Sequence, residues 1–139
     1  MNTDTVAAAK ALVEHYLDRV MAPDLEGARA CVSDGLEITF TGGRRFDAPE
    51  ETTAFNARRY AWVKKRIQRT DACRDPETGD VYVYNTGTLF GAWRDGTGFD
   101  GNRYIDTFVV RDGLIIRTEV WNDSAEILLD RAGLAEAPL

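Results

Sequence analysis

Asp106 is the residue of this sequence whose setting most favours acid–base chemistry. It lies in the segment YIDTFVV, residues 104–110. If this segment is a strand, its side chains alternate between two faces, and Asp106 lies between Tyr104 and Phe108 on an apolar face. A carboxylate buried there is costly unless a charge or a hydrogen-bond donor meets it, and burial raises its pKa. The pattern therefore indicates either a functional acid–base group or a structural aspartate that an arginine or the backbone satisfies.

A second carboxyl group, that of Asp123, follows the next predicted strand. The same alternation puts it on one face with Glu119 and Trp121. It is a candidate proton carrier, and it also stands where it would cap a helical segment over residues 124–129. The sequence leaves both roles open and favours capping.

Histidine and cysteine are too scarce for several common chemistries. The chain has one histidine and two cysteines, whereas a zinc site takes three or four ligands of these types and carboxylates. His15 has no serine or cysteine near it in the sequence, which argues against a nucleophile–base pair. Residues 96–101 match the GxGxxG spacing of dinucleotide-binding loops, but a predicted strand follows where such loops open a helix, which favours a hairpin turn. We therefore expect no metal and no cofactor.

Aromatic residues are concentrated where a ligand cavity could form. A curved sheet covered by a short layer of helices leaves a concavity between the two layers. Seven aromatic side chains are candidate ligand-binding residues: Phe40, Phe55, Trp62, Trp93, Tyr104, Phe108 and Trp121. In this interpretation Phe55 and Trp62 lie on a helix. The alternative is that most of the seven fill the hydrophobic core.

Length and charge narrow the class of protein and its partners. The chain has 139 residues, which is the size of one domain, and we expect a single domain over residues 1–139. Its 23 acidic and 17 basic residues give a formal charge of −6, which argues against nucleic acid and anionic membranes as partners. The basic cluster over residues 58–74 is interpreted as a solvated face. No apolar run is long enough to cross a bilayer and no segment resembles a secretion signal, so we expect a cytoplasmic protein.

The elements that must position these residues follow from hydrophobic periodicity and turn signals. Apolar residues at three- and four-residue spacing predict helices over residues 6–20 and 25–32, and a cap followed by proline and two acids predicts a third over residues 47–63. Alternation predicts strands over residues 36–41, 67–74, 80–93, 103–111 and 114–122. Helices in the first half and hairpins in the second indicate an α+β fold, with a curved antiparallel sheet packed against three helices.

Four segments resemble the ketosteroid isomerase and SnoaL-like superfamily, whose fold is also called nuclear transport factor 2-like. They are the tyrosine-bearing first helix with APDLEG at residues 22–27, VSDGLEI at residues 32–38, YIDTF at residues 104–108 and RDGLI at residues 111–115. The resemblance covers nearly the whole chain. It implies a cone-shaped, cystatin-like α+β domain with a pocket for a small apolar molecule. It also implies a homodimer, which would cover the open face of the sheet.

The resemblance assigns roles to individual residues. Tyr16 falls where the isomerases have the tyrosine of their oxyanion hole, and Asp106 falls where they have a protonated aspartic acid. Both would donate hydrogen bonds to a carbonyl oxygen that gains charge. Phe40 stands where the isomerases carry the aspartate that moves the proton, which argues against steroid-type isomerisation. SnoaL-like cyclases use a single aspartate in the later strands, a role open to Asp106 or Asp123.

These observations predict a cofactor-independent isomerase, cyclase or dehydratase that acts on a small apolar carbonyl compound. Its catalytic residues would be Tyr16, Asp106 and Asp123. The alternative is a homodimer of the same fold that binds a ligand or serves as an accessory subunit without catalysis, and the missing base favours it.

Overall fold

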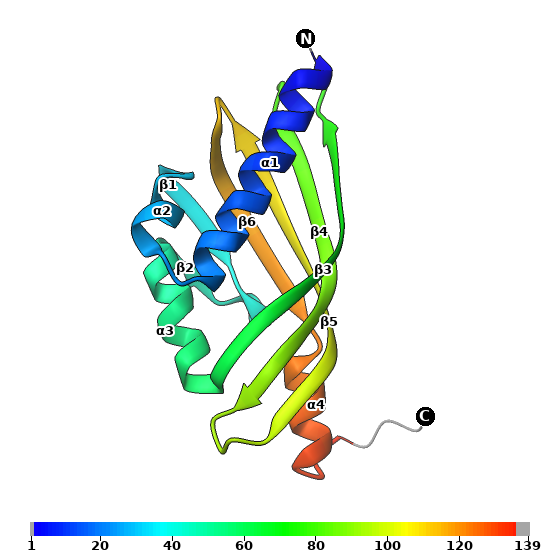
Figure 1. The fold of residues 1–139 in the computed structure, drawn as a ribbon. Helices are drawn as coiled ribbons and strands as arrows, with labels where there is room; N and C mark the ends of the chain where they lie inside the picture. Colours follow the sequence, from blue (N-terminus) through cyan, green and yellow to red (C-terminus); the bar gives the residue numbers. More distant parts are fainter. Residues whose placement is uncertain (1, 136–139) are drawn as a thin grey trace.

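The architecture is one curved sheet with helices on a single face. The computed structural model describes residues 2–135, and the side chains of residues 5–135. Six strands pair in the order β2-β1-β6-β5-β4-β3. Figure 1 shows three helices on the same face of the sheet and a fourth at the end of the chain that follows the last strand. They are α1 (Asn2–Met21), α2 (Leu25–Arg29), α3 (Pro49–Arg59) and α4 (Ser124–Arg131). The predicted α+β class, with its curved sheet and three helices from the first half of the chain, is confirmed.

The four later strands form the meander that turn signals predicted. Strands β3 (Tyr60–Arg74), β4 (Val81–Trp93), β5 (Gly98–Arg111) and β6 (Leu114–Asn122) pair antiparallel in sequence order. The first strand, β1 (Val32–Thr39), instead pairs with β6 in parallel, with Ile38 opposite Thr118. The sheet is thus mixed at one edge. A short turn, η1 (Thr41–Gly43), and the two-residue strand β2 (Arg45–Phe46) follow β1 and close that edge.

The third helix is shorter than the sequence predicts. It ends at Arg59, and residues 60–66 belong to β3, where Tyr60 pairs with Trp93 and Trp62 with Ala92. The prediction that Trp62 lies on a helix is therefore wrong. Aromatic and β-branched residues are frequent in this segment, and a long neighbouring strand gives its backbone groups partners along its whole length. Tertiary pairing overrides the helical periodicity there.

The hydrophobic core lies between α1 and the sheet. Val13 and Leu17 of α1 contact Ile38, Phe108 and Ile115 from three strands, and all five are almost fully buried. Strand alternation directs these side chains to the helix-covered face, as predicted for β5. Because the core occupies only part of this face, the remainder is available for a cavity.

The side chain of Asp24 caps the second helix. The carboxylate of Asp24 accepts a hydrogen bond from the backbone N–H of Gly27 at 2.9 Å, which satisfies one of the free donors of the first turn. This turn determines where α1 ends and therefore where its last residues meet the sheet. No helix among residues 2–135 has the length and hydrophobicity to span a membrane.

Candidate functional site

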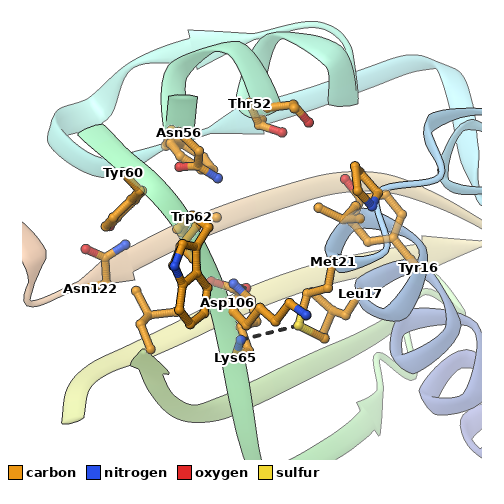
Figure 2. A pocket seen from close by; sticks show the side chains of 18 of the residues that line it. Tyr16, Leu17, Met21, Thr52, Asn56, Tyr60, Trp62, Lys65, Asp106 and Asn122 are labelled. Atoms are coloured by element: carbon orange, nitrogen blue, oxygen red, sulfur yellow. Dashed lines mark hydrogen bonds and ion pairs between the residues drawn. The ribbon is translucent and has the colours of Figure 1, made fainter. Parts of the chain in front are cut away.

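A cavity of about 440 Å³ lies between the helices and the sheet. Its walls come from the last turns of α1 and the Ala22–Pro23 turn, from α3, from the start of β3 and from the covered face of the other strands. Figure 2 shows the side chains from these elements around it. Most of the lining is apolar, which is typical of a site for a small organic molecule that a few polar groups orient.

Asp106 lies in this cavity and is 2% exposed. Strand alternation brings it to the covered face between Tyr104 and Phe108, as the sequence predicts. Its Oδ2 atom lies 3.2 Å from the ammonium nitrogen of Lys65, and its Oδ1 atom has no hydrogen-bond partner among the described residues. Burial raises the pKa of Asp106, and the positive charge of Lys65 opposes that rise without cancelling it. Its carboxyl group therefore has one free oxygen and an unusually high proton affinity.

Lys65 is the functional candidate that the sequence did not reveal. It lines the cavity from β3, and its side chain is 20% exposed. Its ammonium group lies 4.6 Å from the centre of the Tyr104 ring, which is a cation–π contact. Its backbone N–H points to the sulfur of Met21 at 3.3 Å, which ties β3 to the end of α1. In Figure 2 Lys65 and Asp106 lie next to each other.

Tyr16 lines the same cavity from α1 and is 6% exposed. Its ring packs edge-to-face on Phe108, with ring centres 6.0 Å apart. Burial raises the pKa of Tyr16, and the nearby carboxylate of Asp106 adds to the rise. The hydroxyl group therefore stays protonated and can donate a hydrogen bond. The structure brings together two of the three predicted catalytic residues.

The third predicted catalytic residue, Asp123, lies outside the cavity lining. Its carboxylate accepts hydrogen bonds from Arg103 at 2.7 and 3.3 Å, and this contact holds the pKa of Asp123 below its usual range. Asp123 occupies the N-cap position of α4 but makes no side-chain capping bond there. Asn122 provides a side-chain acceptor at the start of α4 instead, because its Oδ1 accepts a hydrogen bond from the backbone N–H of Ser124 at 3.1 Å.

The seven aromatic candidates divide between the cavity and other places. Phe40, Trp62 and Phe108 line the cavity, whereas the other four lie outside its lining. Phe55 packs between Phe40 and Phe46, with ring centres 5.3 and 6.0 Å away. Trp93 stacks on Tyr60 and Phe99, and Trp121 is 51% exposed on the opposite face of the sheet. Alternation explains Trp121, because its neighbours Val120 and Asn122 are the β6 residues that turn inward.

Tyr104 supports the site from behind instead of lining it. Its hydroxyl donates to Oδ1 of Asn85 at 2.6 Å, and Nδ2 of Asn85 donates to the hydroxyl of Thr70 at 2.8 Å. Asn85 is fully buried. Burial raises the pKa of Tyr104, with a further contribution from Asp106. This bonded chain fixes the ring on which the ammonium group of Lys65 lies.

Two further features bear on the chemistry that the site can perform. Phe40, at the position where the resemblance implies a base, contributes an apolar ring to the wall. Within the part of the chain that the structure describes, no three histidine, cysteine or acidic side chains are grouped to hold a metal ion. The groups available for proton transfer in the cavity are therefore carboxyl, phenol and ammonium groups.

The sequence matches no family model and no curated protein. Solved structures match over most of the chain. A nuclear transport factor 2-like protein from Burkholderia thailandensis has a TM-score of 0.69 at 16% identity, covering 92% of this chain and 97% of that one. A protein described as a SnoaL-like polyketide cyclase, from Jannaschia sp., has a TM-score of 0.67 at 18% identity, covering 95% of each chain. TerC, co-crystallized with polyporic acid, has a TM-score of 0.66 at 14% identity, covering 85% of this chain and 93% of its own. At identities this low, the structural matches establish that the fold is shared.

Proposed function

Starting from a chain with the nuclear transport factor 2-like fold, we propose that it binds a small, largely apolar molecule and catalyses proton transfer on it. The reaction class is that of a cofactor-independent isomerase, cyclase or dehydratase acting on a carbonyl compound. The observation that carries this proposal is that Tyr16 and Asp106 line one apolar cavity and that Asp106 keeps a free oxygen there. An apolar cavity with converging polar groups is the usual form of such a site.

The two residues would have different roles. The hydroxyl of Tyr16 would donate a hydrogen bond to the substrate oxygen and stabilise the charge that develops on it. Asp106 would carry the proton, because burial raises its pKa and makes its carboxylate a stronger base than an exposed one. Asp123 takes no part in this proposal, because Arg103 engages its carboxylate away from the cavity lining.

Binding of a phenol tests the role of Tyr16. We expect Tyr16→Phe to weaken the binding of 4-nitrophenol by about tenfold, since one hydrogen bond to a charged or partly charged oxygen is lost while the ring remains in place. Isothermal titration calorimetry would measure the two affinities. Tyr82→Phe is the matched control, because Tyr82 lies on the same sheet and does not line the cavity. Equal affinities for wild type and Tyr16→Phe would remove Tyr16 from the site.

Catalysis itself is tested by proton exchange. A carbonyl compound that fits the cavity should exchange the hydrogen next to its carbonyl for deuterium in D2O, followed by NMR, and Asp106→Asn should abolish the exchange. A protein that binds such compounds and never accelerates exchange would instead support the second candidate function, a non-catalytic ligand-binding protein. The observation that favours this second candidate is the phenyl ring of Phe40 where a base is expected.

We further propose that the molecule is a homodimer formed through the uncovered face of the sheet. Three large apolar side chains are exposed on that face, Tyr84 at 39%, Ile105 at 36% and Trp121 at 51%. Ile105 and Trp121 are direct cross-strand neighbours. Contiguous exposed apolar residues of this kind are typical of surfaces that another protein covers, and a second copy of the chain offers a self-complementary partner.

A further inference from the structure

Lys65 and Asp106 are the charged side chains that strand alternation turns into the cavity. Lys64 and Lys65 both belong to its lining, but only Lys65 turns its side chain to the covered face, and among the described residues Asp106 is the only carboxylate of the lining. The chain as a whole has a formal charge of −6. The remaining ionisable side chains of the lining are the phenols of Tyr16 and Tyr60. An ammonium group in an apolar cavity favours a ligand oxygen that is negative when bound.

The ammonium group of Lys65 has more donors than its protein contacts use. It forms an ion pair with Asp106, with Nζ 3.2 Å from Oδ2, and it also lies over the Tyr104 ring. An ammonium group has three N–H donors. Because Lys65 lines the cavity, a donor is available to a ligand there.

The carboxylate of Asp106 provides a hydrogen-bond acceptor beside this donor. Its Oδ1 atom is buried and has no hydrogen-bond partner among the described residues, although its other oxygen is paired with Lys65. A free acceptor and a free donor therefore lie side by side in the cavity. A hydroxyl group matches this pair, because one oxygen can donate its hydrogen to Oδ1 and accept a hydrogen bond from the ammonium group.

We propose that Lys65 is a ligand-binding residue and that the cavity selects an acidic hydroxyl compound, a phenol or an enol, which it binds as the anion. On binding, the ligand O–H bond breaks and an O–H bond forms at Oδ1 of Asp106, so the negative charge moves from the carboxylate to the ligand oxygen. Lys65 remains an ammonium ion throughout and stabilises that oxygen. This inference rests on the proposed function, and it names the substrate class as the enol form of a carbonyl compound or a phenol.

The surroundings of the pair are consistent with this transfer. Burial raises the pKa of Asp106, which makes its carboxylate a stronger base than an exposed one. The titratable groups that face the pair are Tyr16 from α1 and Tyr104 from β5, whereas Lys64 of β3 turns to the opposite face. The lining residues contributed by α3 have no ionisable side chain. The Tyr104 hydroxyl is engaged by Asn85, so it does not compete for the ligand oxygen.

Two probes of the same shape test the proposal. 4-Nitrophenol can ionise, and its phenolate has a distinct absorption band, whereas 4-nitroanisole has no acidic hydrogen. With wild type, we expect 4-nitrophenol to bind more tightly than 4-nitroanisole and to show the phenolate band at a pH below its own pKa. With Lys65→Met, we expect 4-nitrophenol affinity to fall roughly 10- to 100-fold and the band to disappear, since a hydrogen bond from a charged donor is lost. Binding of 4-nitroanisole should stay within about twofold.

Arg66→Met is the matched control, because it removes one positive charge from the adjacent position on the opposite face of β3, where Arg66 pairs with Asp100. It should leave both probes unchanged. Circular dichroism and thermal unfolding would establish that each variant is folded, and Lys65→Arg, which keeps the charge, should retain part of the phenolate band. Equal binding of the two probes by wild type, or an unchanged band in folded Lys65→Met, would overturn this inference alone. Failure of both probes to bind wild type would overturn the proposed function as well.

Discussion

The carboxyl groups of Asp106 and Asp123 have opposite relations to their surroundings. Asp106 is buried, with one cation beside it, and its pKa is raised, whereas Asp123 is bonded to Arg103 at the surface and its pKa is lowered. Burial disfavours the charged form of an acid, and a guanidinium partner favours it. The two aspartates that the sequence offered as candidate proton carriers are thus distinguished by what surrounds each one.

This difference predicts opposite effects on stability. Because the folded-state pKa of Asp106 lies above its unfolded value, the folded chain binds more protons between the two values. The free energy of unfolding should therefore fall as pH rises through that window. Asp106→Asn should remove this fall. The pKa shift of Asp123 has the opposite sign. Its contribution to the free energy of unfolding is present above the unfolded pKa and is lost as pH falls through the lowered folded pKa. Asp123→Asn should therefore remove this loss of stability at acid pH.

Urea denaturation over a series of pH values would measure both slopes. The two variants control for each other, since each removes one carboxylate and only the sign of the pKa shift differs. A wild-type slope that survives Asp106→Asn would show that this carboxyl is not the group that titrates abnormally.

At the scale of elements, a bulge in β3 determines which basic residue enters the cavity. Ile67 pairs with Gly87 and Arg69 with Thr86, so Gln68 has no partner position of its own in the ladder. On the far side of this extra residue, Thr70 and Ala72 turn inward. Without the extra residue, strict alternation from Thr70 would put Arg66 and Lys64 on the covered face. The bulge shifts the alternation by one residue, so that Lys65 lies there instead. The position of a bulge depends on pairing with β4, which explains why sequence alternation alone did not identify Lys65.

Strand β4 also contains a glycine that the site requires. A Cβ atom at Gly87 would lie 3.0 Å from a ring carbon of Tyr104 and would collide with the backbone carbonyl of Arg66. We expect Gly87→Ala to lower the free energy of unfolding by about 1–3 kcal/mol, because neither the strand nor the buried ring can move aside freely.

Gly35→Ala is the control for this change, since Gly35 also lies in a strand and an added Cβ there has no atom within 4 Å. Thermal or urea unfolding of both variants would test the prediction. If Gly87→Ala were as stable as Gly35→Ala, the close packing of Tyr104 on β4 would be wrong, and with it the fixed platform under Lys65.

At the scale of the whole molecule, the two faces of the sheet differ in what covers them. The helix-covered face holds the core and the cavity, and the opposite face exposes Tyr84, Ile105 and Trp121. A dimer that covers the second face would bury on the order of 800 Å² per partner, the size of a specific protein interface. The cavity is lined from the helix-covered face, so we expect ligand binding not to depend on association.

The proposed dimer predicts a clear change in mass. Trp121→Glu should convert a dimer to a monomer, because a charge would be placed at the centre of an apolar contact and left unpaired. Sedimentation equilibrium or light scattering would report the mass. Leu129→Glu, at an apolar position of α4 that is 41% exposed, should leave the mass unchanged. A monomeric wild type would refute the proposed dimer.

The sequence by itself determined the class of fold, most element boundaries and the inward position of Asp106. These follow from local patterns: helical spacing in α1 and alternation in β4 to β6. Tyr16 was predicted by resemblance, and the structure puts it in the same cavity.

Only the tertiary structure decided which candidates meet. It placed Lys65 beside Asp106, removed Asp123 from the cavity lining, and turned Trp121 to the opposite face of the sheet. Each of these outcomes depends on strand pairing between segments that are far apart in sequence, on a bulge, or on a partner from another strand. Local periodicity contains no information on such pairings, because the energy that selects them comes from contacts formed only in the folded chain.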